Sequence, residues 1–113
     1  MLAVLLYKKY KVRLSRKELE SLLGMLYWYL REQEKAETTR VLSLGELAQI
    51  QQAIKLGQRL QQRLLNVEQN NFKISLNLQE ATTLEGILRQ LPLDDQHPFE
   101  RMIAYRINEV LTR

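Results

Sequence analysis

The sequence predicts an α+β domain that is mostly helical, in which duplicated β-α-α units share a two-stranded antiparallel sheet and four helices. Three observations predict this class: polar and apolar residues alternate early in the chain, three capping boxes each precede a helical apolar repeat, and two segments resemble each other. The 113 residues, 45% of them apolar and 27% charged, suit one core. We expect a single domain over residues 1–113, with a first unit at 1–69 and a second at 70–113.

The first expected strand lies between Leu2 and Leu14. Even positions carry mostly apolar side chains, interrupted by Lys8, while Lys9, Lys11 and Arg13 occupy odd positions. A period of two is typical of a strand with one buried face. The three basic side chains are therefore expected to point outward together.

A helix over residues 16–35 is expected next. Ser15 and Glu18 have the spacing of a capping box, in which each residue satisfies a backbone amide of the other. Leucines then recur at helical spacing: Leu19, Leu22, Leu23, Leu26 and Leu30. This pattern predicts an amphipathic helix whose leucine face is buried.

Ser43 and Glu46 repeat the capping signal ahead of a long helix, predicted over residues 44–68. Gly57 lies inside this helix and indicates a close helix crossing or a kink. Its basic stripe at i, i+4 spacing is interpreted as a solvated face: Lys55, Arg59 and Arg63.

The second half of the chain repeats the order. A short alternating stretch predicts a strand at residues 72–76, and Asn77 with Glu80 forms a third capping box before a third helix. Pro92 ends that helix, and Pro98 suits the first turn of a fourth. The expected core is built where the two strands pair and the helices cover their apolar face.

Tyr10 to Leu26 can be aligned with Phe72 to Leu88 without a gap. Six of the 17 positions are identical: Lys11 with Lys73, Leu14 with Leu76, Glu18 with Glu80, Leu22 with Leu84, Gly24 with Gly86, and Leu26 with Leu88. Any capped amphipathic helix that follows a strand would share part of this pattern. The paired glycines favour duplication, because the pattern does not require them.

The net charge of +4 is concentrated in one segment. Ten residues without an acid carry six basic side chains: Lys8, Lys9, Lys11, Arg13, Arg16 and Lys17. The rest of the chain holds 11 basic and 13 acidic residues, a net charge of −2. The basic character therefore belongs to one surface and not to the whole protein.

This basic surface suggests nucleic-acid binding as an alternative function. The candidate contacts are Lys9, Lys11, Arg13, Arg16, Lys17 and Lys73. Such a face fits phosphates, and a two-stranded ribbon fits a major groove. The order of elements and the basic strand resemble ribbon-helix-helix repressors, which pair two β-α-α units around an antiparallel ribbon. The helices of the first unit are longer than that family's. Lysine on an exposed strand also protects an edge from aggregation.

The leading expectation is a non-catalytic, self-associating protein-interaction module. The apolar start of the first strand would expose Leu5 and Tyr7 on its outer face, which favours a homodimer. Tyr27 and Trp28 are candidate partner contacts, since Trp and Tyr are favoured interface anchors. The competing interpretation of this aromatic group is a central core helix.

Signals of catalysis, metal binding and cofactor binding are weak. The chain has no cysteine, its only histidine, His97, precedes a helix, and its four glycines are scattered. We therefore expect no enzyme activity, no cofactor and no metal. The apolar run at residues 2–7 is too short to span a bilayer and lacks the features of a signal peptide. We expect a cytoplasmic protein without a membrane segment.

Overall fold

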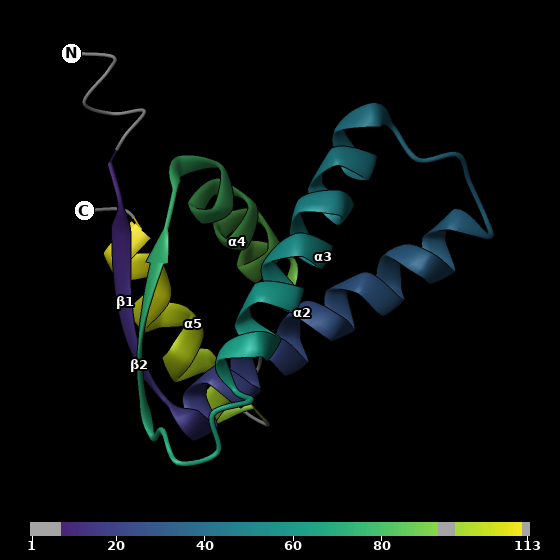
Figure 1. Cartoon of the computed structure of the whole chain (residues 1–113). Coiled ribbons are helices and arrows are strands. Elements are labelled where there is room, and N and C mark those ends of the chain that lie inside the picture. The colour runs from purple at the N-terminus through teal and green to yellow at the C-terminus, as the bar shows by residue number, and fades with distance from the viewer. Residues whose placement is uncertain (1–7, 93–96, 112–113) are drawn as a thin grey trace.

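In the part of the chain that the structure describes, two strands and four helices follow one another in the order β-α-α-β-α-α (Figure 1). The structure is a computed structural model that describes residues 8–92 and 97–111. Its elements are β1 (Tyr10–Ser15), α2 (Arg16–Glu37), α3 (Leu44–Arg63), β2 (Asn71–Leu76), α4 (Leu78–Gln90) and α5 (Pro98–Leu111). The predicted class, mostly helical α+β with a two-stranded antiparallel sheet, is confirmed for this part of the chain.

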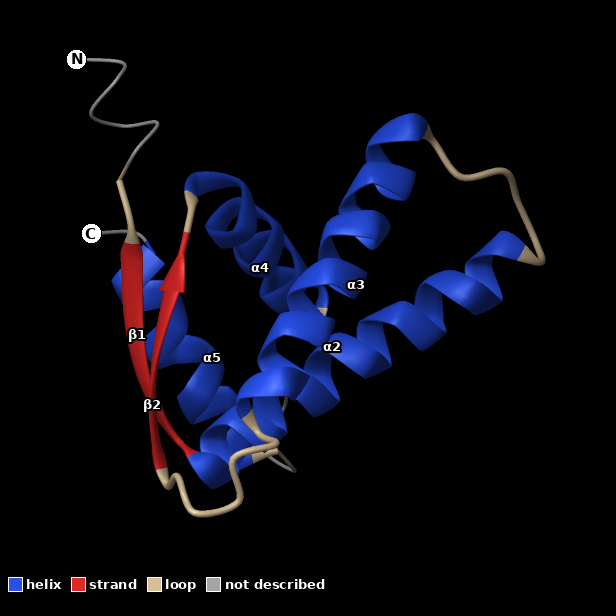
Figure 2. Cartoon of the chain, in the orientation of Figure 1, coloured by secondary structure: helices blue, strands red, loops and turns tan. Residues whose placement is uncertain are grey.

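The two strands form an antiparallel ribbon along one side of the molecule, and the helices lie on its inner side (Figure 2). Val12 lies opposite Ile74 at the middle of the ribbon. The inward side chains are buried: Val12, Leu14, Phe72, Ile74 and Leu76. The alternation predicted from the sequence is therefore the alternation of the ribbon, with one apolar face in the core.

Three capping boxes start three helices as predicted. At the start of α2, the Glu18 amide donates to Ser15 Oγ at 3.2 Å, and the Ser15 amide donates to Glu18 Oε1 at 2.8 Å. The same pair of bonds forms at Ser43 with Glu46 and at Asn77 with Glu80. Each box satisfies amides that the first helical turn leaves without intrahelical partners.

Two element boundaries differ from the prediction. The long helix was expected to reach residue 68, but α3 ends at Arg63, and Val67 is 81% exposed because the segment after α3 turns away from the core. β1 begins at Tyr10, so Lys8 and Lys9 precede the ladder. The expected earlier part of the strand, including Leu5 and Tyr7, lies outside the described residues.

The loop at residues 38–43 and the turns of α2 and α3 that flank it project from the body, and we name this part the arm (Figure 1). Nearer the body, α3 passes Tyr27 at Gly57. A Cβ there would lie 3.8 Å from the ring atom Cε1, an ordinary van der Waals distance, so this contact does not require a glycine. At the arm's tip the Arg40 guanidinium contacts the Glu46 carboxylate at 2.5 Å. This pair ties the connecting loop to the first turn of α3.

The Glu46 carboxyl is expected to titrate with a pKa of about 2, below its ordinary value of 4.5. Hydrogen bonds from the Arg40 side chain and the Ser43 amide stabilise the charged form. Because the folded pKa is lowered, the contribution to stability is complete above pH 4.5 and is lost as the pH falls toward 2. Carboxyl-carbon NMR should give this midpoint, and Arg40→Ala should move it back toward 4.5. A wild-type midpoint near 4.5 would contradict the Arg40 contact.

Replacement of Gly24 by alanine is expected to raise the free energy of unfolding by about 1 kcal/mol. Gly24 lies within α2, and no atom lies within 4 Å of the position that a Cβ would take. Gly86 is the matched comparison, because a Cβ there would lie 3.2 Å from Gln49 Nε2 and the amide would have to shift. Urea unfolding should show a smaller gain for Gly86→Ala than for Gly24→Ala. Equal gains would contradict the packing of α3 on α4.

Candidate nucleic-acid interface

The outer face of the ribbon carries basic side chains from both strands. Its members are Lys11, Arg13, Lys73 and Ser75, and we name this set the cationic ribbon face. All four are exposed, while their neighbours along each strand are buried, apart from Tyr10, which is half-buried. Because polar and apolar residues alternate along each strand, one face of the ribbon lies in solvent and the opposite face packs into the core.

Arg13 lies directly opposite Lys73 in the ladder, and Lys11 lies opposite Ser75. The Arg16 amide donates to the Asn70 carbonyl at 2.9 Å, which places the hydrogen-bonded pairs at even positions of β1. The Arg13–Lys73 pair is thus of the non-hydrogen-bonded kind, in which opposite side chains are closest. Two cations held in such a pair destabilise the ribbon.

The chain's own acids do not neutralise this face. Among the described residues, no acidic side chain forms an ion pair with any of five exposed cations: Lys9, Lys11, Arg13, Lys17 and Lys73. Lys9 lies just before β1 and borders the ribbon, whereas Lys17, in the first turn of α2, lines a different hollow with Trp28 and Phe99. Four of the six predicted nucleic-acid contacts, Lys9, Lys11, Arg13 and Lys73, are therefore exposed on or beside the ribbon.

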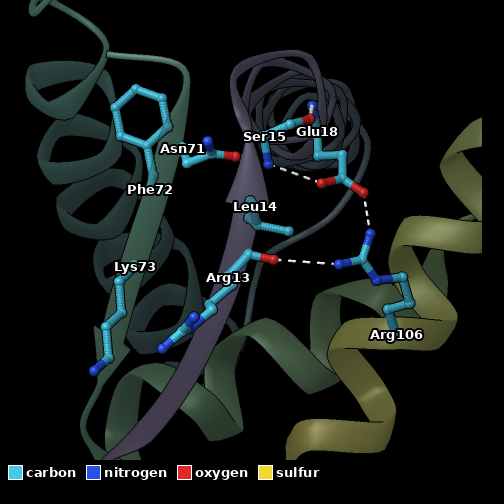
Figure 3. A pocket seen from close by; sticks show the side chains of 8 residues that line it. All are labelled: Arg13, Leu14, Ser15, Glu18, Asn71, Phe72, Lys73 and Arg106. Atoms are coloured by element: carbon cyan, nitrogen blue, oxygen red, sulfur yellow. Dashed lines mark hydrogen bonds and ion pairs between the residues drawn. The ribbon is translucent and has the colours of Figure 1, made fainter.

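A hollow of about 460 Å³ opens at the end of the ribbon, where the strands meet α5 (Figure 3). Figure 3 shows the Arg13 and Lys73 side chains extending from neighbouring strands, with Arg106 reaching over from α5. Arg106 forms an ion pair with Glu18 and donates to the Arg13 carbonyl at 3.3 Å. Arg106 is thus neutralised, unlike Arg13 and Lys73.

The Glu18 carboxyl remains charged despite its partly covered position. Burial acts to raise its pKa, but the Ser15 amide and the Arg106 guanidinium outweigh burial, so the pKa lies below its ordinary value. Glu18 therefore serves both the cap of α2 and the ion pair to α5.

Arg16, the sixth predicted contact, is directed away from the cationic ribbon face. Its guanidinium donates to the carbonyls of Gln69 at 3.0 Å and Leu64 at 3.2 Å, and also to that of Asn66. It also lies 5.4 Å from the centre of the Phe72 ring. The structure therefore gives Arg16 a role in holding the segment between α3 and β2.

The predicted partner-binding residues do not form one surface in the described part of the chain. Leu5 and Tyr7 lie outside the described residues. Tyr27 is 42% exposed, and its hydroxyl donates to Gln61 Oε1 at 3.1 Å. Trp28 is half-buried and packs against the core, so the aromatic group is divided between core and surface.

The basic stripe on α3 is exposed, which agrees with the predicted solvated face, but two of its members also contact other elements. Arg59 contacts Glu80 at 3.3 Å and donates to the Ser75 carbonyl at 2.9 Å, while the Arg63 guanidinium lies 5.9 Å from the Phe72 ring centre. Arg106 was not identified from the sequence. The signal that could have found it is the match between the end of α3 and α5, which is described below.

Within residues 8–92 and 97–111, no group of three or more histidine, cysteine or acidic side chains could hold a metal ion. No helix in the same part of the chain is long and apolar enough to cross a membrane. Comparison with family models, curated proteins and solved structures gives no match to this chain.

Proposed function

We propose that this chain is a non-catalytic module that binds nucleic acid through the cationic ribbon face. The observation that carries the proposal is the opposition of Arg13 and Lys73 without a neutralising acid among the described residues. Like charges in a closest cross-strand pair cost stability. A phosphate held between them would offset that cost, so the arrangement is better suited to an anionic partner than to bare water.

The chemistry of the face favours nucleic acid over a single small anion. Exposed cations lie before β1 at Lys9, along β1 at Lys11 and Arg13, and on β2 at Lys73, so their charge is spread along the ribbon. A series of phosphates matches this spacing of charge, and a two-stranded ribbon is narrow enough for a major groove about 12 Å wide. The proposal includes a cytoplasmic location, where such a partner is present.

The test is a salt-titrated binding assay with labelled duplex and single-stranded DNA. Lys9, Lys11 and Arg13 are changed together to glutamine, and the matched control changes Lys35, Lys55 and Arg89, which are exposed on helices. Both variants lose the same charge. The ribbon variant is expected to lower the slope of log K against log salt by roughly 2–3, whereas the control leaves it nearly unchanged.

Two outcomes would contradict nucleic-acid binding by this face. One is no binding of either DNA at about 50 mM salt, where phosphate contacts are strong. The other is an equal loss of affinity in the ribbon variant and the control, which would show dependence on net charge alone.

Self-association through a protein interface is the second candidate. It is favoured by apolar side chains at the arm's tip, where Val41 is 93% and Leu44 is 85% exposed. Light scattering at high micromolar concentration should give a dimer mass, and changing Val41 and Leu44 to serine should reduce it. A monomer mass for the unchanged protein would refute this candidate.

A further inference from the structure

Two arginines from different helices make the same pair of contacts at the two outer edges of the ribbon. Arg106 of α5 contacts the Glu18 carboxylate and donates to the Arg13 carbonyl. Arg59 of α3 contacts the Glu80 carboxylate and donates to the Ser75 carbonyl. In each case the arginine joins a strand carbonyl to the acid of the following capping box.

The two sets of contacts are related by the spacing of the internal repeat. Ser75 follows Arg13 by 62 positions, and Glu80 follows Glu18 by 62 positions. The ladder has the same relation, because Val12 lies directly opposite Ile74, which is its equivalent in the repeat. An approximate twofold axis therefore passes through this central pair, perpendicular to the ribbon.

The second helix of each unit, α3 or α5, also follows the repeat, so the similarity extends beyond the strand and the first helix. With Arg59 aligned to Arg106, the core-facing positions also agree: Leu56 with Ile103, Gly57 with Ala104, Leu60 with Ile107, and Leu64 with Leu111. Four of these side chains are at most 1% exposed: Leu56, Leu60, Ile103 and Ile107. The helical contacts agree too, since α3 packs on α4 as α5 packs on α2.

The second helix of each half reaches the strand of the other half. α3, from the first half, contributes the arginine at the edge of β2, and α5, from the second half, contributes the arginine at the edge of β1. We infer that the chain consists of two interleaved copies of one β-α-α unit, with Arg59 and Arg106 as equivalent positioning residues. Each fixes one outer edge of the ribbon without itself facing a ligand.

The arm is then the part of the first copy that has no counterpart. The strands and first helices are offset by 62 positions, but Arg59 and Arg106 are offset by only 47. The first copy is therefore longer by 15 residues between these points, and the excess falls in the hairpin of α2 and α3. Figure 1 shows this hairpin projecting beyond the body.

The interleaving has a consequence that rests on the proposed function: the nucleic-acid partner is double-stranded. Lys11 and Lys73 are equivalents on either side of the axis, so the ligand meets the same side chain twice. The two antiparallel strands of a duplex are related by twofold axes perpendicular to its length, which matches this arrangement. A single strand has no such symmetry.

The first experiment tests the interleaving without a ligand. Arg59→Gln and Arg106→Gln are each expected to lower Tm by about 3–6 °C, since each loses one ion pair and one carbonyl hydrogen bond. In double-mutant cycles, Glu80→Gln should reduce the effect of Arg59→Gln but not that of Arg106→Gln, and Glu18→Gln should reduce the effect of Arg106→Gln but not that of Arg59→Gln. Glutamine is chosen because it preserves the capping box. Lys55→Gln on the same face of α3 is the control and should leave Tm unchanged.

Coupling between Arg59 and Glu18 would overturn the equivalence of the two copies. So would a lower Tm in one arginine variant without a lower Tm in the other. These outcomes are independent of any nucleic acid. Failure of the proposed function, seen as no binding of DNA, would leave this first result intact.

The second experiment separates positioning from contact. Lys11→Gln and Lys73→Gln should each lower the salt slope for a duplex by about 0.9 and by equal amounts, whereas Arg59→Gln and Arg106→Gln should weaken binding without changing the slope. The unchanged protein should prefer duplex to single strand. Unequal effects of the two lysines, a lowered slope in either arginine variant, or a preference for single strand would overturn the inference.

Discussion

Replacement of Arg16 by alanine is expected to lower the free energy of unfolding by about 2–3 kcal/mol, as hydrogen bonds from a charged donor are stronger than neutral ones. The Arg16 guanidinium donates to three carbonyls, at Leu64, Asn66 and Gln69. These carbonyls belong to the segment between α3 and β2, in which the Asn66 carbonyl also accepts from the Gln69 amide at 3.1 Å. Without Arg16 the segment that leads into β2 loses its common donor. Urea unfolding followed by circular dichroism measures the loss.

The neighbouring residue provides a matched control. Lys17 is exposed and forms no ion pair with a described residue, so Lys17→Ala is expected to change stability by less than about 0.5 kcal/mol. Arg16→Lys should recover little, because an ammonium cannot present the planar fork that reaches several carbonyls at once. Full recovery by lysine, or equal losses at Arg16 and Lys17, would contradict the role given to the guanidinium.

Lys73→Glu is expected to change stability and affinity in opposite directions. The new carboxylate would lie opposite Arg13, so a repulsive cross-strand pair becomes attractive and the free energy of unfolding rises by up to about 1 kcal/mol. Affinity for DNA should fall roughly 10–100-fold at low salt, because a phosphate contact is replaced by a repulsion. Thermal unfolding and the binding assay on the same preparation measure both.

Lys73→Gln is the intermediate case, which removes the repulsion without adding an attraction. It should give a smaller gain in stability and a smaller loss of affinity than Lys73→Glu. A loss of both stability and affinity in Lys73→Glu would mean that the lysine supports the fold. That result would contradict nucleic-acid binding by the cationic ribbon face.

Local signals in the sequence were sufficient to predict the type and order of the helices and strands. Each capping box acts within four residues, so Ser15, Ser43 and Asn77 could be assigned as helix starts before any packing was known. The two-residue alternation similarly separated Val12 and Leu14 from Lys11 and Arg13. These patterns also gave the outward set that forms the cationic ribbon face.

The errors came from contacts between distant parts of the chain. Arg16 shares the charge and spacing of the basic strand, yet its acceptors lie 48 to 53 residues away. The apolar period of the long helix continues to Val67, although the helix ends at Arg63. Arg59 is exposed, as predicted, but its partners could not be identified, because Glu80 and the Ser75 carbonyl belong to the other half of the chain.

The sequence alone determined the fold class, the helix starts, the strand faces and the concentration of charge near β1, since each depends on residues a few positions apart. Only the tertiary structure decided which cations remain available and which are occupied. Arg106 meets Glu18 across 88 positions, and such a meeting depends on which helix packs beside which strand. That choice is made by burial of the whole core, which no local pattern contains.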